Sequence, residues 1–148
     1  MFTLRLSTPA DGAAVVDIWR RAVDATHHFL TPEDRQAIDA EVVGFLPAAT
    51  LDLAVDAADR PVAFMLLDGD RMEALFVDPD HRGTGVGRLL VQDALRRHPE
   101  LATDVNEQNG QAVGFYERLG FERIGRSGQD SQGPVSYTHL RAHETRED

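Results

Sequence analysis

The chain has 148 residues, and its hydrophobic content of 42% suits a single domain that buries a core without disulfides or a structural metal. It contains no cysteine, which excludes disulfides, thiolate metal ligands and a cysteine nucleophile. Its formal net charge of −10 argues against a nucleic-acid partner and favours cationic partners, because nucleic acids are bound by clustered positive charge.

We expect a soluble, cytoplasmic protein that makes no contact with a membrane. The first residues become polar too soon for the apolar region of a signal peptide, and no apolar run approaches the length of a membrane span. No internal repeat or low-complexity linker divides the chain. We therefore interpret residues 1–135 as one domain of alternating elements.

In chain order, the sequence predicts a mixed α/β (α+β) domain. Residues 2–6 alternate between apolar and polar types, as in a strand. Thr8 and Thr31 each precede a proline and an apolar stripe at helical spacing, as at helix starts, and the second stripe ends at Pro47. The later expected elements are strands at 51–55, 62–67 and 71–77, a helix that starts near Val86 and ends before His98, a strand at 101–105, a helix capped by Asn109 and ended by Gly120, and a strand at 121–124.

A glycine-rich segment leads from the third of those strands into a helix. Its residues are Arg82, Gly83, Thr84, Gly85, Val86, Gly87 and Arg88. Glycine lets the backbone approach a ligand closely, and the free N–H groups of a first helical turn bind anions. The same pattern also fits a turn that merely ends one element and begins the next. Arg88 stands where the phosphate loop of nucleotide hydrolases needs lysine, and two helices and a hairpin precede the segment, which disfavours a dinucleotide fingerprint.

The pattern Arg82-x-x-Gly85-x-Gly87, between an apolar strand and an amphipathic helix, resembles the acetyl-CoA loop of the GNAT superfamily of N-acetyltransferases. A second motif at 109–121, with an asparagine, Ala-x-x-Phe-Tyr and a closing Gly-Phe, is similar to a later helix of that family. The resemblance covers about residues 2–126 and extends to the small bacterial YjaB-type members, whose Asp-Ala-Thr-His connector is present at 24–27. It implies the GNAT fold, a mixed, mostly antiparallel twisted sheet of six to seven strands, flanked by about four helices and splayed at its middle strands.

The resemblance implies that acetyl-CoA is the cosubstrate. The backbone of Leu75, Phe76 and Val77 would bind the pantetheine arm like an added strand. The amides of residues 82–88 would hold the pyrophosphate, and the guanidinium groups of that segment would add charge. Asn109 would bond the cofactor, although a simple helix cap explains this asparagine equally well.

Two residues are candidates for moving protons. The resemblance implies that Tyr116 protonates the departing CoA thiolate; the alternative is a core aromatic on an apolar helix face. Glu73 is a candidate general base, because strand alternation puts it on the same side as Leu75 and Val77. A solvent-facing carboxylate is the equally weighted alternative for Glu73.

The candidates for binding the acceptor lie on the first helix and on the connector after it. They are Trp19, His27, His28 and Phe29. Either histidine could orient a substrate or act as base, although each also fits a partly buried structural residue. The expected reaction is direct attack of a primary amine, on a small molecule or on a protein lysine or N-terminus, on the acetyl thioester. A non-catalytic CoA- or acyl-CoA-binding protein of the same fold and an interaction module with an empty groove are the alternatives. The protein is expected to be a monomer or a homodimer.

The tail differs in character from the rest of the chain. Residues 127–134 are rich in Gly, Ser, Gln and Asp, and from Ser136 the chain lacks the apolar strand with which the family usually ends. We expect residues 136–148 to be partly disordered and foreign to the fold, for example a library adapter that was read through. His139 and His143 are four residues apart, but they lack acidic neighbours in a convincing arrangement, and we predict no metal site.

Overall fold

The computed structural model describes residues 2–26, 31–106, 110–127 and 137–143, and it places four α-helices and seven strands there. The helices are α1 (Gly12–Thr26), α2 (Pro32–Phe45), α3 (Val86–Arg97) and α4 (Gly110–Arg118). The strands are β1 (Thr3–Leu6), β2 (Asp52–Val55), β3 (Pro61–Asp68), β4 (Arg71–Val77), β5 (Glu100–Asn106), β6 (Glu122–Ser127) and β7 (Tyr137–His143). Three 3-10 turns are η1 (Pro9–Asp11), η2 (Leu46–Ala48) and η3 (Pro79–His81).

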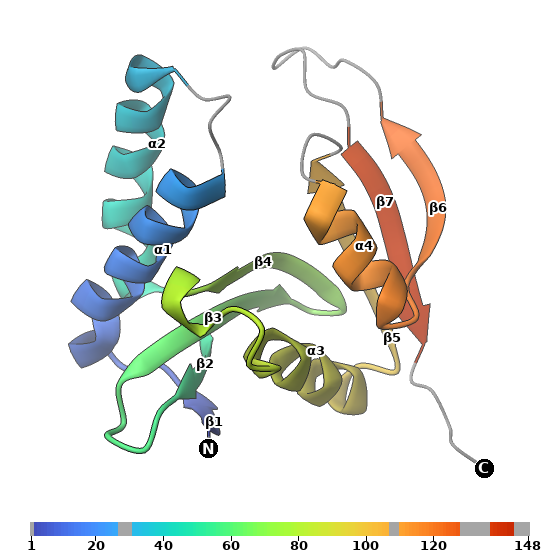
Figure 1. The fold of residues 1–148 in the computed structure, drawn as a ribbon, viewed down its shortest axis with the longest axis horizontal. Coiled ribbons are helices and arrows are strands. Elements are labelled where there is room, and N and C mark those ends of the chain that lie inside the picture. The colour runs from blue at the N-terminus through green and yellow to red at the C-terminus, as the bar shows by residue number, and fades with distance from the viewer. Residues whose placement is uncertain (1, 27–30, 107–109, 128–136, 144–148) are drawn as a thin grey trace. The chain divides into compact units, whose positions relative to one another are not determined.

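The strands follow the order β1-β2-β3-β4-β5-β7-β6 in one sheet. Figure 1 shows the two last strands, β6 and β7, side by side. The pairs β1–β2, β2–β3, β5–β7 and β6–β7 are antiparallel, whereas β4 and β5 are parallel. The expected fold, a mixed and mostly antiparallel sheet with about four helices, is thereby confirmed. Each predicted strand and helix before the tail is present, with ends shifted by a few residues.

The chain divides into two compact units. The first unit holds Met1–Leu66 and Ala74–Leu90, and the second holds Leu67–Glu73 and Val91–Asp148, so that β3, β4 and α3 each run from one unit into the other. In the first unit α1 covers β2 and β3 with one apolar face. The buried residues of this cluster are Val15, Val16, Ile18, Trp19, Val23, Leu46, Leu51, Leu53, Val55 and Phe64.

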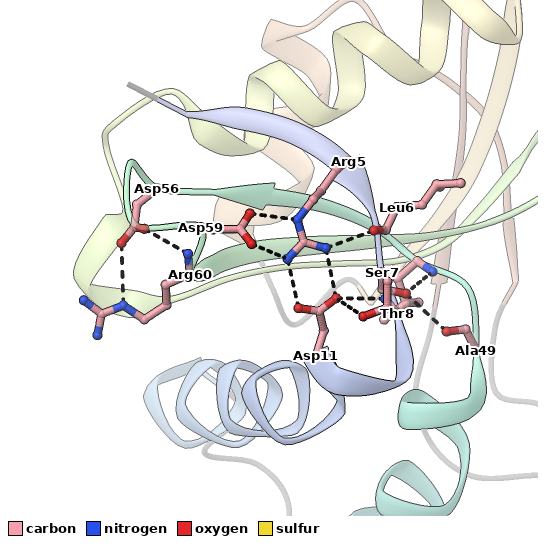
Figure 2. A network of polar contacts seen from close by, with 10 residues as sticks. Arg5, Leu6, Ser7, Thr8, Asp11, Ala49, Asp56, Asp59 and Arg60 are labelled. Carbon is pink, nitrogen blue, oxygen red and sulfur yellow. Dashed lines mark hydrogen bonds and ion pairs between the residues drawn. The ribbon is translucent and has the colours of Figure 1, made fainter.

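A polar network fixes the start of α1 (Figure 2). Arg5 on β1 donates to both carboxylate oxygens of Asp11, at 2.9 and 3.0 Å, and its Nε donates to Asp59 in the β2–β3 turn at 3.0 Å. The backbone N–H of Thr8 also donates to Asp11, at 2.8 Å. The 3-10 turn η1 takes up Pro9–Asp11, and the α-helix begins at Gly12. The network therefore joins β1, η1 and the β2–β3 turn.

The helix start at Thr31 is confirmed, since its side chain accepts a hydrogen bond from the Asp34 N–H at 3.1 Å. The apolar stripe predicted for this helix is only partly covered. Leu46, in η2, is buried, whereas Phe45 is 53% exposed and no residue of α2 itself is buried. The second helix therefore packs less deeply than its spacing of apolar residues indicated.

Part of the tail, for which the sequence predicted partial disorder, is a strand at Tyr137–His143. These residues form β7, which pairs antiparallel with β5 along its whole length and with β6 on its other side. Leu140 and Ala142 are fully buried in the second unit. These two apolar residues alternate with polar ones, which is enough for a strand with one covered face. The predicted foreign origin of the tail remains a prediction.

Candidate active site

The glycine loop follows β4 through the capped turn η3. Asp78 caps this turn, since its side chain accepts a hydrogen bond from the Asp80 N–H at 2.9 Å. The Thr84 hydroxyl donates to the His81 carbonyl at 2.6 Å, which folds the loop back on the turn. The loop then enters α3, whose first backbone hydrogen bond runs from Leu89 N–H to the Gly85 carbonyl at 3.0 Å. The N–H groups of residues 86–88 therefore belong to a first helical turn and have no acceptor within the helix.

Two loop glycines adopt a backbone conformation that side chains disfavour. Gly83 has φ 77° and Gly85 has φ 84°, and a Cβ added at either position would meet no atom within 4 Å. Glycine is required here by backbone conformation rather than by crowding, and the side of the loop where a Cβ would lie is open. An open glycine loop that leads into a helix N-terminus suits a bound anion.

Two guanidinium groups frame the loop. Arg82 and Arg88 are both exposed, and neither makes an ion pair with any residue that the structure describes. Most other arginines that the structure describes are paired with carboxylates, as Arg5 is with Asp11. The charge of Arg82 and Arg88 is therefore available for a ligand with phosphate groups.

The strand before the loop leaves part of one edge outside the sheet ladder. The register between β4 and β5 pairs Arg71 with Ala102 and Met72 with Thr103, and it does not extend to Leu75, Phe76 or Val77. On that edge the backbone groups of these three residues are outside the ladder with β5. Such an edge can accept an extended ligand through main-chain hydrogen bonds.

Tyr116 is buried in the second unit, on α4. Its ring lies 5.3 Å from that of Phe121 and 5.2 Å from that of Phe115, both in edge-on geometry. Burial raises the pKa of the Tyr116 hydroxyl above its usual value of 10.0. The phenol therefore keeps its proton at neutral pH, as a proton donor must. None of the described residues hydrogen-bonds this hydroxyl.

Glu73 lies on β4 in an ion pair. Its Oε1 is 3.0 Å from Arg71 Nε, and Arg71 also pairs with Asp104 on β5. The Glu73 side chain is 40% exposed. This contact matches the solvent-facing alternative for Glu73, and its role as a base stays a prediction.

The acceptor-side candidates are only partly visible. Trp19 is 5% exposed, within the core of the first unit, and the Arg35 guanidinium lies 4.8 Å from its ring centre. His27, His28 and Phe29 lie outside the described residues, as does Asn109. The predicted roles of all four remain predictions, and contact of Trp19 with an acceptor is also untested.

Sequence reasoning missed a contact at the turn before the loop. Arg21 on α1 contacts two carboxylates of the turn before the loop, those of Asp78 and Asp80. No local pattern could reveal it, because the partners lie 57 and 59 positions apart in the chain. Within the part of the chain that the structure describes, no group of three or more potential ligands is placed to hold a metal ion.

In acyl-CoA-dependent transferases, a mostly antiparallel sheet typically contains a strand with an incomplete ladder, and this strand leads through a glycine loop into a helix. The chain has this arrangement. The chain belongs to the GNAT family, because the family model for the acetyltransferase (GNAT) domain matches residues 24–135. It is an N-acetyltransferase, as the sequence predicted, and it uses the acetyl-CoA donor of its family.

The particular proteins to which the chain is similar include two named as peptidyl-lysine N-acetyltransferases. YjaB of Escherichia coli (strain K12), which carries that name, is 53% identical over 133 residues, or 90% of each chain. YjaB of Salmonella typhimurium is 51% identical over 133 residues, which cover 90% of this chain and 92% of that one. The solution structure of apo-form YjaB from Escherichia coli matches with a TM-score of 0.89, covering 95% of this chain and 97% of that one at 51% identity. In the described parts of the chain, no helix has the length and apolar character needed to cross a membrane.

Proposed function

We propose that the chain transfers the acetyl group of acetyl-CoA to the side-chain amine of lysines in proteins. The observation that carries this proposal is the 53% identity, over 90% of both chains, to an enzyme named for peptidyl-lysine acetylation. The net charge of −10 agrees with a cationic acceptor. Small-molecule amines and protein N-termini are the other acceptors within the same reaction class.

Donor binding is proposed to use residues of the first unit and Asn109. The N–H groups of the loop, with Arg82 and Arg88, would hold the diphosphate of acetyl-CoA. The free edge of β4 at Leu75, Phe76 and Val77 would hydrogen-bond the pantetheine arm. These roles are supported by the open glycines and by the unpaired guanidinium groups described above. Asn109 would add a contact to the cofactor.

Acetyl-CoA supplies an activated thioester, so the chain itself has to orient the amine and move two protons. We propose that the Tyr116 hydroxyl donates a proton to the departing thiolate, which its burial supports by keeping the hydroxyl protonated. The proton of the attacking amine would be taken by Glu73, directly or through water, or by His27 or His28. Trp19 and Phe29 would help to shape the acceptor pocket.

One observation weighs against Glu73 as the base. The proposed base Glu73 is engaged by Arg71 at 3.0 Å, so its carboxylate is not free to approach an amine while that pair persists.

The identity of the acceptor can be tested directly because the chain contains no lysine. All 15 of its Lys and Arg residues are arginine. Any acetyl-lysine in the reaction must therefore come from the added acceptor and not from the enzyme. The protein is incubated with acetyl-CoA and one of three acceptors: a lysine-rich protein, the same protein with its lysines blocked by methylation, and a polyamine. Mass spectrometry should find acetyl-lysine in the first reaction alone. Acetylation confined to the polyamine, or to protein N-termini, would contradict a lysine acceptor.

Three further expectations are proposed on the same basis. The reaction should be independent of metal, so that dialysis against a chelator leaves the rate unchanged. The protein should act in the cytoplasm without a nucleic-acid or membrane partner. It should be a monomer or a homodimer, which sedimentation at several concentrations would distinguish.

A further inference from the structure

The turn that leads into the glycine loop is held by a side chain from the first helix. Arg21 on α1 donates from Nη1 to Asp78 Oδ2 and from Nη2 to Asp80 Oδ2, both at 2.6 Å. One planar guanidinium group thus spans two carboxylates of the same turn. Such paired, charge-assisted contacts fix orientation as well as distance.

Asp78 links this contact to the rest of the first unit. Its side chain is 11% exposed, and its backbone N–H donates to the Val62 carbonyl on β3 at 2.8 Å. Its carbonyl accepts from the His81 N–H at 2.8 Å, and the His81 carbonyl in turn accepts from the Thr84 hydroxyl at 2.6 Å. A continuous series of hydrogen bonds therefore runs from α1 and β3 to the loop.

Without the guanidinium group, the negative charges of this turn would not be neutralised. The carboxylates of Asp78 and Asp80 would face the same space without a cation between them. His81 Nδ1, which is buried and without a hydrogen-bond partner among the described residues, lies 3.9 Å from Asp78 Oδ2 and would be the nearest replacement. Asp17, 4.0 Å from Arg21, adds another negative charge on α1. Loss of Arg21 should therefore let the turn rearrange rather than simply lose one contact.

We propose that Arg21 is a positioning residue for the donor: it holds the Asp78–His81 turn so that the glycine loop is ordered before the diphosphate of acetyl-CoA binds. The proposal rests on the proposed function, which places the diphosphate on this loop. A loop that is already ordered loses less conformational entropy on binding, so Arg21 contributes affinity without touching the ligand. The effect should be specific to donors that carry a diphosphate.

The test compares Arg21→Met with the wild type by calorimetric titration with CoA. Arg21→Met should weaken CoA binding about ten-fold, the size typical of a coupled contact. Arg21→Lys keeps the charge but cannot span both carboxylates, and should give an intermediate affinity. In turnover, kcat/KM for acetyl-CoA should fall by the same factor in Arg21→Met, whereas kcat/KM for S-acetylpantetheine, which lacks the diphosphate, should stay at the wild-type value.

The neighbouring Arg20 provides a matched control. It also lies on α1 and makes a two-contact ion pair, with Asp39 on α2 at 2.8 and 2.9 Å, and its side chain is 46% exposed against 39% for Arg21. Arg20→Met should change thermal stability about as much as Arg21→Met but leave CoA binding unchanged. If Arg21→Met does not fold, Arg21→Lys and Asp80→Asn take its place in the same titrations.

Wild-type affinity for CoA in Arg21→Met, or equal weakening in Arg20→Met, would overturn the role of Arg21. An equal loss with S-acetylpantetheine would do the same, because it would indicate general damage to the site. Failure of the wild type itself to bind CoA would instead overturn the proposed function.

Discussion

Tyr116 combines a buried phenol with aromatic neighbours that can hold the ring without its hydroxyl. Its ring packs edge-on against Phe115 and Phe121, so the ring position does not depend on a hydrogen bond to the oxygen. Packing and chemistry can therefore be separated at this residue by removing one oxygen atom.

Replacement of Tyr116 by phenylalanine should lower kcat by about 100-fold, because a positioned general acid contributes on that order. CoA affinity and thermal stability should change little, since the phenyl ring fills the same space. The measurement is the rate of thiol release across a range of pH, beside a CoA titration. Turnover equal to that of the wild type at every pH would show that another group protonates the thiolate.

Gly85 provides a second test at the scale of the residue, with Gly44 on α2 as its control. An added Cβ meets no atom within 4 Å at either position, but only Gly85 has a positive φ, of 84°. Gly85→Ala should therefore destabilise the fold by about 1–2 kcal/mol and weaken CoA binding. Gly44→Ala should stabilise it by about 0.5–1 kcal/mol. Urea unfolding checks both values, and equal effects of the two changes would contradict the role of backbone conformation at Gly85.

Among the elements, the start of α1 depends on one buried carboxylate. The hydrogen bonds from Arg5, and those from Thr8, lower the pKa of Asp11 from 3.8 to about 2, although burial opposes the shift. Because the pKa is lower in the folded state, the stabilisation by Asp11 is complete above pH 3.8 and is lost as the pH falls toward about 2.

Urea unfolding at about pH 6 and about pH 3 tests this linkage. Between these two pH values the wild type should lose more stability than Asp11→Asn, which has no proton to bind at this position. Asp59 pairs with the same arginine but its side chain is 71% exposed, so Asp59→Asn should keep most of the wild-type pH dependence. Identical pH dependence in Asp11→Asn and the wild type would contradict the assignment.

The last strand is tested by a pair of neighbours on opposite faces of β7. Leu140 is fully buried and Arg141 is exposed. Leu140→Ala should cost about 2–5 kcal/mol of unfolding free energy, and Arg141→Ala should stay within about 0.5 kcal/mol. Equal, small losses in both variants would mean that residues 137–143 do not pack as a strand.

At the scale of the whole molecule, local signals in the sequence predicted the order of elements and the position of the glycine loop between β4 and α3. The cap at Thr31 and the glycines at 83 and 85 each act within a few residues, so their sequence patterns carry the information. Contacts between distant segments were not predictable in this way. The contact of Arg21 with Asp78 depends on the packing of α1 beside the β4 turn. Strand β7 has a largely polar sequence and depends on its pairing with β5.

The acetyl-transfer reaction of the whole enzyme is tested most directly by thiol release from acetyl-CoA, measured with and without a lysine-rich protein acceptor. We predict release only when the acceptor is present, with one acetyl-lysine formed for each thiol. Because the chain has no lysine of its own, the product count is not affected by self-modification. Binding of CoA without any acceptor-dependent thiol release, across protein and small-molecule amines, would contradict the transfer reaction and favour the non-catalytic alternative.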